Sequence, residues 1–153
     1  MEKDPLDRDR NINLQAHEII TSLHQNQLLV VNPKRKNGLI LYKKYHAEFA
    51  GPGAAVGGLF DTDVEAIIPV GNISAIAPQT TRERIAGYLI RRQWVRLIKQ
   101  ITDNPSPQER AQLILSQFEN WFDSQTAEQL PDEAFAALVG VLPQTIRGAI
   151  DRN

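Results

Sequence analysis

Three histidines and one nearby carboxylate are the residues of this chain whose types could bind a metal ion. His17 and His24 are seven positions apart and can share one helix face, while His46 and Glu48 flank a single alanine. Metal sites of this kind normally include a closely spaced ligand pair, as in H-E-x-x-H, and the sequence has no such motif. We interpret the histidines as surface or packing residues and predict no metal and no cofactor.

Nucleophilic catalysis has as little support in the sequence. The absence of cysteine excludes thiolate nucleophiles, thiolate zinc sites and disulfides, and no serine lies in a nucleophile-elbow motif. The glycine-rich segment 51–58 lacks the P-loop lysine and the dinucleotide-binding spacing, which favours a flexible connection. Asp61, Asp63 and Glu65 alternate without the later glycine and glutamate of an EF-hand loop, which favours a solvated turn. We therefore predict that the protein is not an enzyme.

Basic residues gather in a short loop that the strand pattern places at a hairpin tip. Lys34, Arg35 and Lys36 form this tip, and Lys43 and Lys44 follow, interleaved with Tyr42 and Tyr45. Lysines and arginines on a protruding hairpin can neutralise phosphates, and tyrosines can stack on unpaired bases. The same lysines could instead keep a sheet edge from aggregating, and this alternative stays open.

Charge is segregated along the chain although it nearly balances overall. The segment 82–99 holds six basic residues and one acidic residue, whereas the segment from Asp103 to the end holds eight acidic residues and three arginines. The first segment supplies the candidate phosphate contacts Arg84, Arg91, Arg92 and Arg96. The second segment would repel a polyanion.

Residues 131–152 indicate two short helices joined by a glycine turn. Ala136 is small enough to let the helices cross closely, and Gly140 can adopt the left-handed conformation that ends a helix. Pro143 suits the first turn of the second helix, because its missing N–H costs nothing there. Apolar residues at Val139 and Ile146 would close a small core between the two helices.

This spacing resembles the helix-turn-helix of phage repressors and of the cyclic-AMP receptor protein family. The resemblance covers about residues 131–152 and implies duplex DNA as the partner, with the second helix in the major groove. In the receptor-protein family that helix opens with Ser, Arg and Glu and has another Arg one turn on, where this sequence has Leu142, Pro143, Gln144 and Gly148. The residues that remain as possible DNA contacts under this resemblance are Gln144, Thr145, Arg147 and Arg152. An ordinary antiparallel helix pair has the same apolar spacing, so both interpretations stay open.

Hydrophobic periodicity predicts the elements that position these residues. A helix is expected from Leu14 to about Gln25, with Asn13 as its cap. Strands at 27–31 and 38–45 are expected to form one hairpin, and strands at 64–70 and 73–77, joined at Gly71-Asn72, a second. Together they predict one small sheet packed on the first helix.

The second half is predicted to be helical. Capping patterns at Thr80 and Ser106 open helices that run to about Thr102 and Ser124. Their apolar stripes are typical of a core, and the stripe of Ile90, Trp94 and Ile101 is also the candidate dimer face.

The prediction is therefore an α+β fold: a small N-terminal antiparallel β-sheet with one helix, then a helical C-terminal half ending in a helix-turn-helix. A mobile leader (1–12), an α+β subdomain (13–79) and a helical subdomain (80–153) are expected. A content of 42% hydrophobic and 23% charged residues is ordinary for a globular protein. The chain has neither an apolar run that could span a bilayer nor a signal-peptide pattern at its start, which predicts a soluble cytoplasmic protein without membrane contact.

Two functional hypotheses follow. The first is a sequence-dependent DNA-binding transcriptional regulator that acts as a homodimer. The alternative is a non-enzymatic protein–protein interaction or adaptor module whose degenerate helix-turn-helix does not bind DNA. Pro143 and Gly148 at expected contact positions and the acidic C-terminal half favour the alternative.

Overall fold

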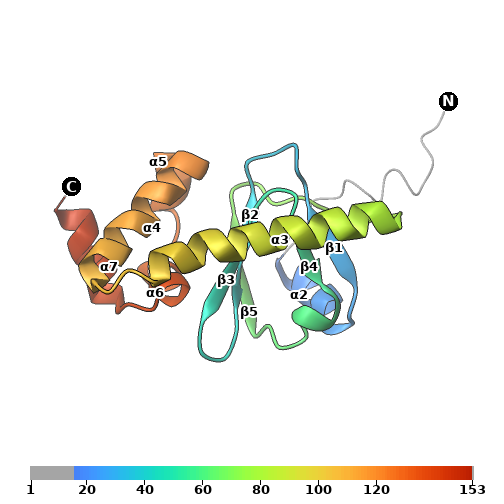
Figure 1. Ribbon diagram of the computed structural model, residues 1–153, viewed down its shortest axis with the longest axis horizontal. Helices are drawn as coiled ribbons and strands as arrows, with labels where there is room; N and C mark the ends of the chain where they lie inside the picture. Colours follow the sequence, from blue (N-terminus) through green and yellow to red (C-terminus); the bar gives the residue numbers. More distant parts are fainter. Residues whose placement is uncertain (1–15, 153) are drawn as a thin grey trace.

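The chain has the predicted α+β fold, with strands in the N-terminal half and helices in the C-terminal half (Figure 1). The structure, a computed structural model, describes the backbone of residues 16–152 and the side chains of residues 18–152. The predicted leader (1–12) and the predicted cap Asn13 lie outside the described residues. In chain order the elements are α2 (Ala16–His24), β1 (Leu28–Val31), β2 (Gly38–Tyr42), β3 (Ala47–Ala50), β4 (Ala55–Gly57), the 3-10 helix η1 (Gly58–Phe60), β5 (Ala66–Val70), β6 (Ala75–Ile76), α3 (Thr81–Thr102), α4 (Pro107–Trp121), α5 (Ser124–Glu128), α6 (Asp132–Val139) and α7 (Pro143–Asp151).

The strands form two antiparallel sheets of three strands each rather than one. The strand order is β4-β1-β6 in the first sheet and β3-β2-β5 in the second. In the second sheet Tyr42 of β2 lies opposite Ala47 of β3 and Ala66 of β5. Strand β2 is central, and it is almost wholly buried because Ile40 on one face and Leu39 and Leu41 on the other pack into the two hydrophobic clusters.

The two predicted hairpins do not form, although their strands exist. Strand β1 pairs with β4 and β6, and β2 pairs with β3 and β5, so segment 32–37 crosses from one sheet to the other, as does the segment between β5 and β6. The buried side chain of Asn37 holds both crossings. Its Nδ2 donates to the carbonyls of Asn32 and Arg35 (3.0 Å each), and its Oδ1 accepts from the Ser74 N–H (3.0 Å). The Asn37-Gly38 pair therefore marks the place where the chain crosses between the two sheets, and the Asn37 side chain holds this crossing.

Two further predictions in this region were wrong: where one strand ends, and the flexible loop that follows it. The strand expected to end at Tyr45 ends at Tyr42, and residues 43–46 turn into β3 to make a local hairpin. The expected flexible loop 51–58 contains β4. A Cβ at Gly51 would collide with the Trp94 ring, and one at Gly87 would come within 3.0 Å of the Ala55 Cβ. The small residues here thus let α3 approach the sheet closely.

Helix α3 is the element that joins the two halves. It begins as predicted, with the Thr80 Oγ1 accepting a hydrogen bond from the Glu83 N–H (3.1 Å), and its 22 residues span about 33 Å. Figure 1 shows α3 running across both sheets toward the helical end. Trp94 packs against the hydrophobic cluster of each half.

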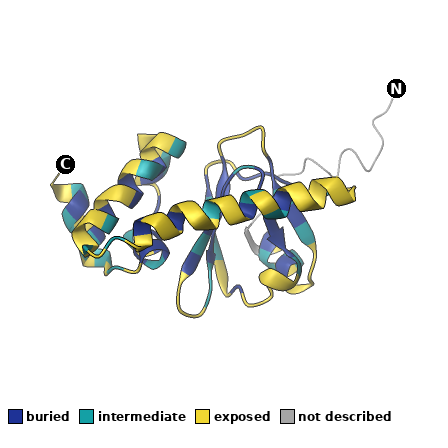
Figure 2. Ribbon diagram, viewed as in Figure 1, coloured by how far each residue is buried: buried dark blue, intermediate teal, exposed yellow. Residues whose placement is uncertain are grey.

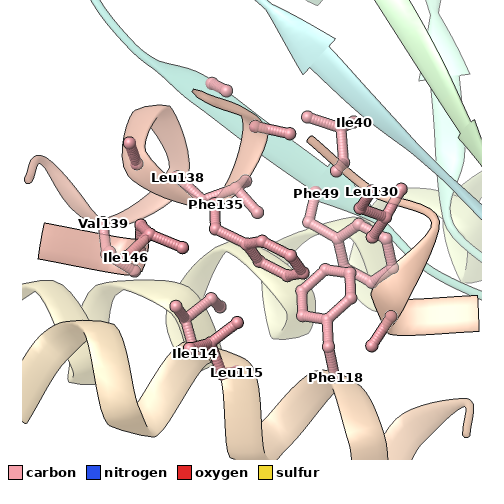
Figure 3. Close-up of a cluster of buried hydrophobic side chains, with 14 of the residues drawn as sticks. Ile40, Phe49, Ile114, Leu115, Phe118, Leu130, Phe135, Leu138, Val139 and Ile146 are labelled. Atoms are coloured by element: carbon pink, nitrogen blue, oxygen red, sulfur yellow. The ribbon is translucent and has the colours of Figure 1, made fainter. Parts of the chain in front are cut away.

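The helical half shares its core with the second sheet. Phe49 of β3 reaches among the helices, with its ring centroid 4.9 Å from that of Phe118, and Phe118 lies 5.2 Å from Phe135 (Figure 3). Helix α4 starts at the predicted Ser106 cap but ends at Trp121, and α5 was not predicted. Because Trp94 and Ile101 belong to this core, the stripe that was expected to form a dimer face is covered within one chain.

The predicted helix, glycine turn and helix at the C-terminus are all present. Gly140 follows α6 with φ 69° and ψ 43°, and its N–H donates to the Ala136 carbonyl (2.9 Å). Helix α7 begins at Pro143 and buries Ile146 and Ala149. It packs on both α6 and α4, which gives a three-helix arrangement.

Candidate functional site

The expected DNA contacts on α7 are only partly available. Gln144 and Arg152 are exposed, and Thr145 is half-buried. The guanidinium of Arg147 donates to both carboxylate oxygens of Asp132 on α6, at 3.0 Å each. Arg147 is thus the most strongly held of the four candidates.

The surroundings of α7 are acidic. Asp132 and Glu133 occupy the first turn of α6, and the segment from Asp103 to the end carries a net charge of −5. Leu142 lies at the position where the resemblance places the start of the recognition helix, and its side chain is 67% exposed. A phosphate backbone would therefore meet carboxylates and an apolar side chain here.

The basic residues predicted on one hairpin lie on two separate turns. Lys34, Arg35 and Lys36 are exposed in the crossing between β1 and β2. Lys44 lies in the β2–β3 turn, 5.3 Å from the Tyr45 ring centroid. Lys43 points inward to an ion-pair network, so the single basic surface that we expected is divided.

The predicted phosphate contacts on α3 do not share one face. Arg84 is exposed and donates to the Thr81 Oγ1 (3.1 Å). Arg92 and Arg96 are exposed, and among residues 18–152 neither guanidinium has an ion-pair partner. Arg91 is buried, so its predicted role as a surface phosphate contact was wrong.

Arg91 is buried because it pairs with Asp61, a residue expected in a solvated turn. Its two Nη atoms donate to the two Asp61 carboxylate oxygens at 2.9 and 3.0 Å, and its Nη2 also donates to Glu48 (3.2 Å). The Gly57 N–H donates to Asp61 as well (2.7 Å). Burial alone would raise the pKa of Asp61, but these hydrogen bonds and the guanidinium charge hold that pKa below its usual value.

Lys43 extends the network and fixes the position of η1. Its Nζ lies 3.3 Å from Glu48, 3.4 Å from Asp61 and 3.2 Å from Asp63, and it donates to the Phe60 carbonyl (2.7 Å). Burial would lower the pKa of Lys43, yet the surrounding carboxylates raise it above its usual value. The network therefore anchors η1, which carries Phe60, beside α3.

A hollow of about 790 Å³ lies over this network, between η1, the β2–β3 turn, β3 and α3. The network residues Lys43, Glu48 and Arg91 form part of its lining. The rest of the lining, which we call the α3 face, is Tyr88, Arg92, Val95, Arg96 and Lys99 of α3 with Phe60 of η1. The rings of Phe60 and Tyr88 meet edge to face at 5.5 Å.

The spacing in α3 explains this surface. Tyr88, Arg92, Val95 and Lys99 follow the i, i+4, i+7, i+11 pattern that defines one side of a helix. The sequence located Arg92 and Arg96. Tyr88 and Val95 were missed although they have the same helical spacing, and Phe60 was missed because its place beside α3 depends on how η1 packs.

The histidines with described side chains make structural contacts. The His24 Nε2 lies 2.6 Å from the Val64 carbonyl oxygen, and the His46 Nε2 lies 3.1 Å from a Glu48 carboxylate oxygen. The side chain of His17 lies outside the described residues. Within the described part of the chain, no three histidine, aspartate or glutamate residues are grouped as metal ligands would be.

Comparisons with models of protein families, with curated proteins and with solved structures found no match to this chain. None of the helices described between residues 16 and 152 combines the length and the apolar character needed to cross a membrane.

Proposed function

We propose that the protein is a non-enzymatic module that binds a partner protein through the α3 face. The observation that carries this proposal is the mixture, on one side of α3, of exposed apolar side chains with Arg92 and Arg96, which have no ion-pair partner among residues 18–152. Phe60 is 67% exposed, and Ile85 and Leu89, which flank the α3 face, are 54% and 52% exposed. Figure 2 shows how much of α3 is exposed. Exposed apolar groups in contact with one another typically mark interaction sites.

The residue types on the α3 face favour a protein over a nucleic acid. Arginine and aromatic residues are enriched in protein–protein interfaces, whereas lysine is depleted. Nucleic-acid surfaces are more polar and more uniformly basic. Here a phenylalanine, a tyrosine and a valine share the lining with Arg92, Arg96 and Lys99, and Arg91 is neutralised below them.

Site-specific photo-crosslinking tests this proposal. A photo-reactive residue in place of Leu89 is expected to give covalent adducts with protein in extracts of the source cells. The control position is Gln112 on α4, which is also exposed but lies at the far end of the molecule beside α7. Protein adducts from position 89 and none from 112 support the proposal. Nucleic-acid adducts, or equal yields at both positions, contradict it.

Duplex DNA binding through α7 is a second candidate, which the packing of α7 against α4 and α6 favours. Gln144 and Arg152 would contact the bases. The phosphates would be held by exposed basic residues of α3 and of the β1–β2 crossing: Arg84, Arg92, Arg96, Lys34, Arg35 and Lys36. Its test is retention on a mixed duplex pool at two salt concentrations. Phosphate contacts predict salt-sensitive retention that Gln144→Ala alters in sequence preference; no retention at low salt eliminates this candidate.

A further inference from the structure

The α3 face has two chemical zones that together define a kind of partner. We propose, on the basis of the protein-binding function above, that it binds an acidic amphipathic helix of a partner protein. The partner helix places one large apolar side chain in the hollow and its carboxylates on Arg92 and Arg96.

The apolar zone lies at the η1 end of the hollow. Phe60 and Tyr88 form an aromatic corner there, and Val95 continues the apolar lining along α3. Ile85 extends the apolar surface by one helical turn before Tyr88, and Leu89 follows Tyr88 directly; both are exposed. A large apolar side chain in this corner would lose contact with water, which favours its burial.

The basic zone lies on the outer edge of the same hollow. Arg92 and Arg96 are one turn apart, and among residues 18–152 neither has an ion-pair partner. Lys99 follows and has only an exposed pair with Asp103 (2.9 Å). Carboxylates one turn apart on a partner helix match the spacing of the two arginines, about 6 Å. From Tyr88 to Lys99 the face is about 16 Å long, which is the length of a three-turn helix.

The floor of the hollow explains why the partner's carboxylates go to the edge. Lys43 and Arg91 are already paired with Glu48 and Asp61, so the floor has no cation to offer. A carboxylate inserted there would approach Glu48. An apolar group at the centre and acidic groups on the α3 side are therefore the complementary arrangement.

The probe is a capped synthetic peptide of about three turns with leucines and one phenylalanine on one face and glutamates one turn apart beside them. Its binding to the full chain is measured by fluorescence anisotropy. A peptide of the same composition with its helical periodicity scrambled is the matched probe. We expect saturable binding of the amphipathic peptide at least about tenfold tighter than that of the scrambled one.

Two double variants test the basic zone. Arg92→Glu with Arg96→Glu is expected to weaken binding at least about tenfold, and a peptide with lysine in place of glutamate is expected to restore it. Lys34→Glu with Lys36→Glu changes the net charge equally at exposed positions outside the hollow and is expected to change binding by less than about twofold. Phe60→Ser tests the apolar zone: it should weaken binding of the acidic peptide to the wild-type arginines and binding of the charge-swapped peptide to the Arg92→Glu with Arg96→Glu variant.

The outcomes separate this proposal from the function on which it rests. Equal binding of the two peptides, no binding of either, or displacement by a single-stranded oligonucleotide of equal charge contradicts the acidic-helix proposal. If position 89 still gives protein adducts that the double arginine variant abolishes, the protein-binding function stands with a partner of different chemistry. If the purified chain self-associates through this face, a second copy is the occupant and the proposal is wrong.

Discussion

At the scale of single residues, the pair of Asp61 and Arg91 shows how a structural ion pair supports the binding surface. Arg91 comes 30 positions after Asp61, and the pair forms under the hollow, where the Asp61 side chain is 0% exposed. The Gly57 N–H and Lys43 complete the surroundings of the carboxylate and tie η1 to β2. This pair holds Phe60 beside Tyr88 but offers no charge to a partner.

Removing the charge of Asp61 should destabilise the fold strongly. Asp61→Asn keeps the side-chain shape but leaves the buried Arg91 without its main counterion, so we expect the free energy of unfolding to fall by about 3–5 kcal/mol. Urea denaturation measures this change. Asp63→Asn is the control, because Asp63 is 65% exposed and its pair with Lys43 should contribute less than about 1 kcal/mol. A similar loss in both variants contradicts the account.

The lowered pKa of Asp61 predicts that the stability of the fold decreases in acid. The pKa of this carboxyl is lowered in the folded state, so the stabilisation is complete above the unfolded pKa of about 3.9 and is lost as pH falls through the lower folded pKa. The stability difference between the wild type and Asp61→Asn should therefore shrink as pH falls below about 4. Urea unfolding of both proteins from about pH 6 to about pH 2.5 checks this. A difference that stays constant over that range would show that the pKa of Asp61 is the same in the folded and unfolded states, which contradicts the account.

At the scale of elements, the sequence patterns that mark helix starts were reliable, whereas the patterns that suggest which strands pair were not. The caps Thr80 and Ser106 and the helical periodicity located α3 and α4, because these features depend on neighbours within one turn. Strand partners are distant in sequence, and the Asn37–Gly38 turn signal could not reveal that the Asn37 side chain holds two sheet crossings. For the candidate site, Arg92 and Arg96 could be found from sequence, whereas the contact between Phe60 and Tyr88 depends on how η1 packs on α3.

Two glycines near the C-terminus should respond to alanine in opposite directions. Gly140 has φ 69°, and a Cβ there would have open space. Gly140→Ala should therefore lower the free energy of unfolding by about 1–2 kcal/mol, the cost of holding alanine in the left-handed conformation. Gly148 lies inside α7 with equally open space, and Gly148→Ala should stabilise the protein by about 0.5–1 kcal/mol. Thermal denaturation of the two variants measures both effects. Stabilisation by Gly140→Ala would contradict the left-handed turn between α6 and α7, and destabilisation by Gly148→Ala would contradict the open helical position at 148.

At the scale of the whole molecule, α3 combines a structural and a binding role. Its inner side, with Trp94 at the centre, joins both hydrophobic clusters, while its outer side carries the α3 face. The helices of the acidic segment lie at one end of α3 (Figure 1). The α3 residues of the α3 face fall between positions 88 and 99. Because α3 is fixed on two cores, a partner would meet a surface that is already ordered, which reduces the entropy lost on binding.

The most direct test of the central claim is the crosslinking yield from position 89 in the two charge-reversal backgrounds. If the α3 face binds a partner protein, Arg92→Glu with Arg96→Glu should abolish the protein adduct, and Lys34→Glu with Lys36→Glu should leave its yield unchanged. Equal yields in both backgrounds, with both variants folded by circular dichroism, would contradict the claim that the α3 face is the binding surface.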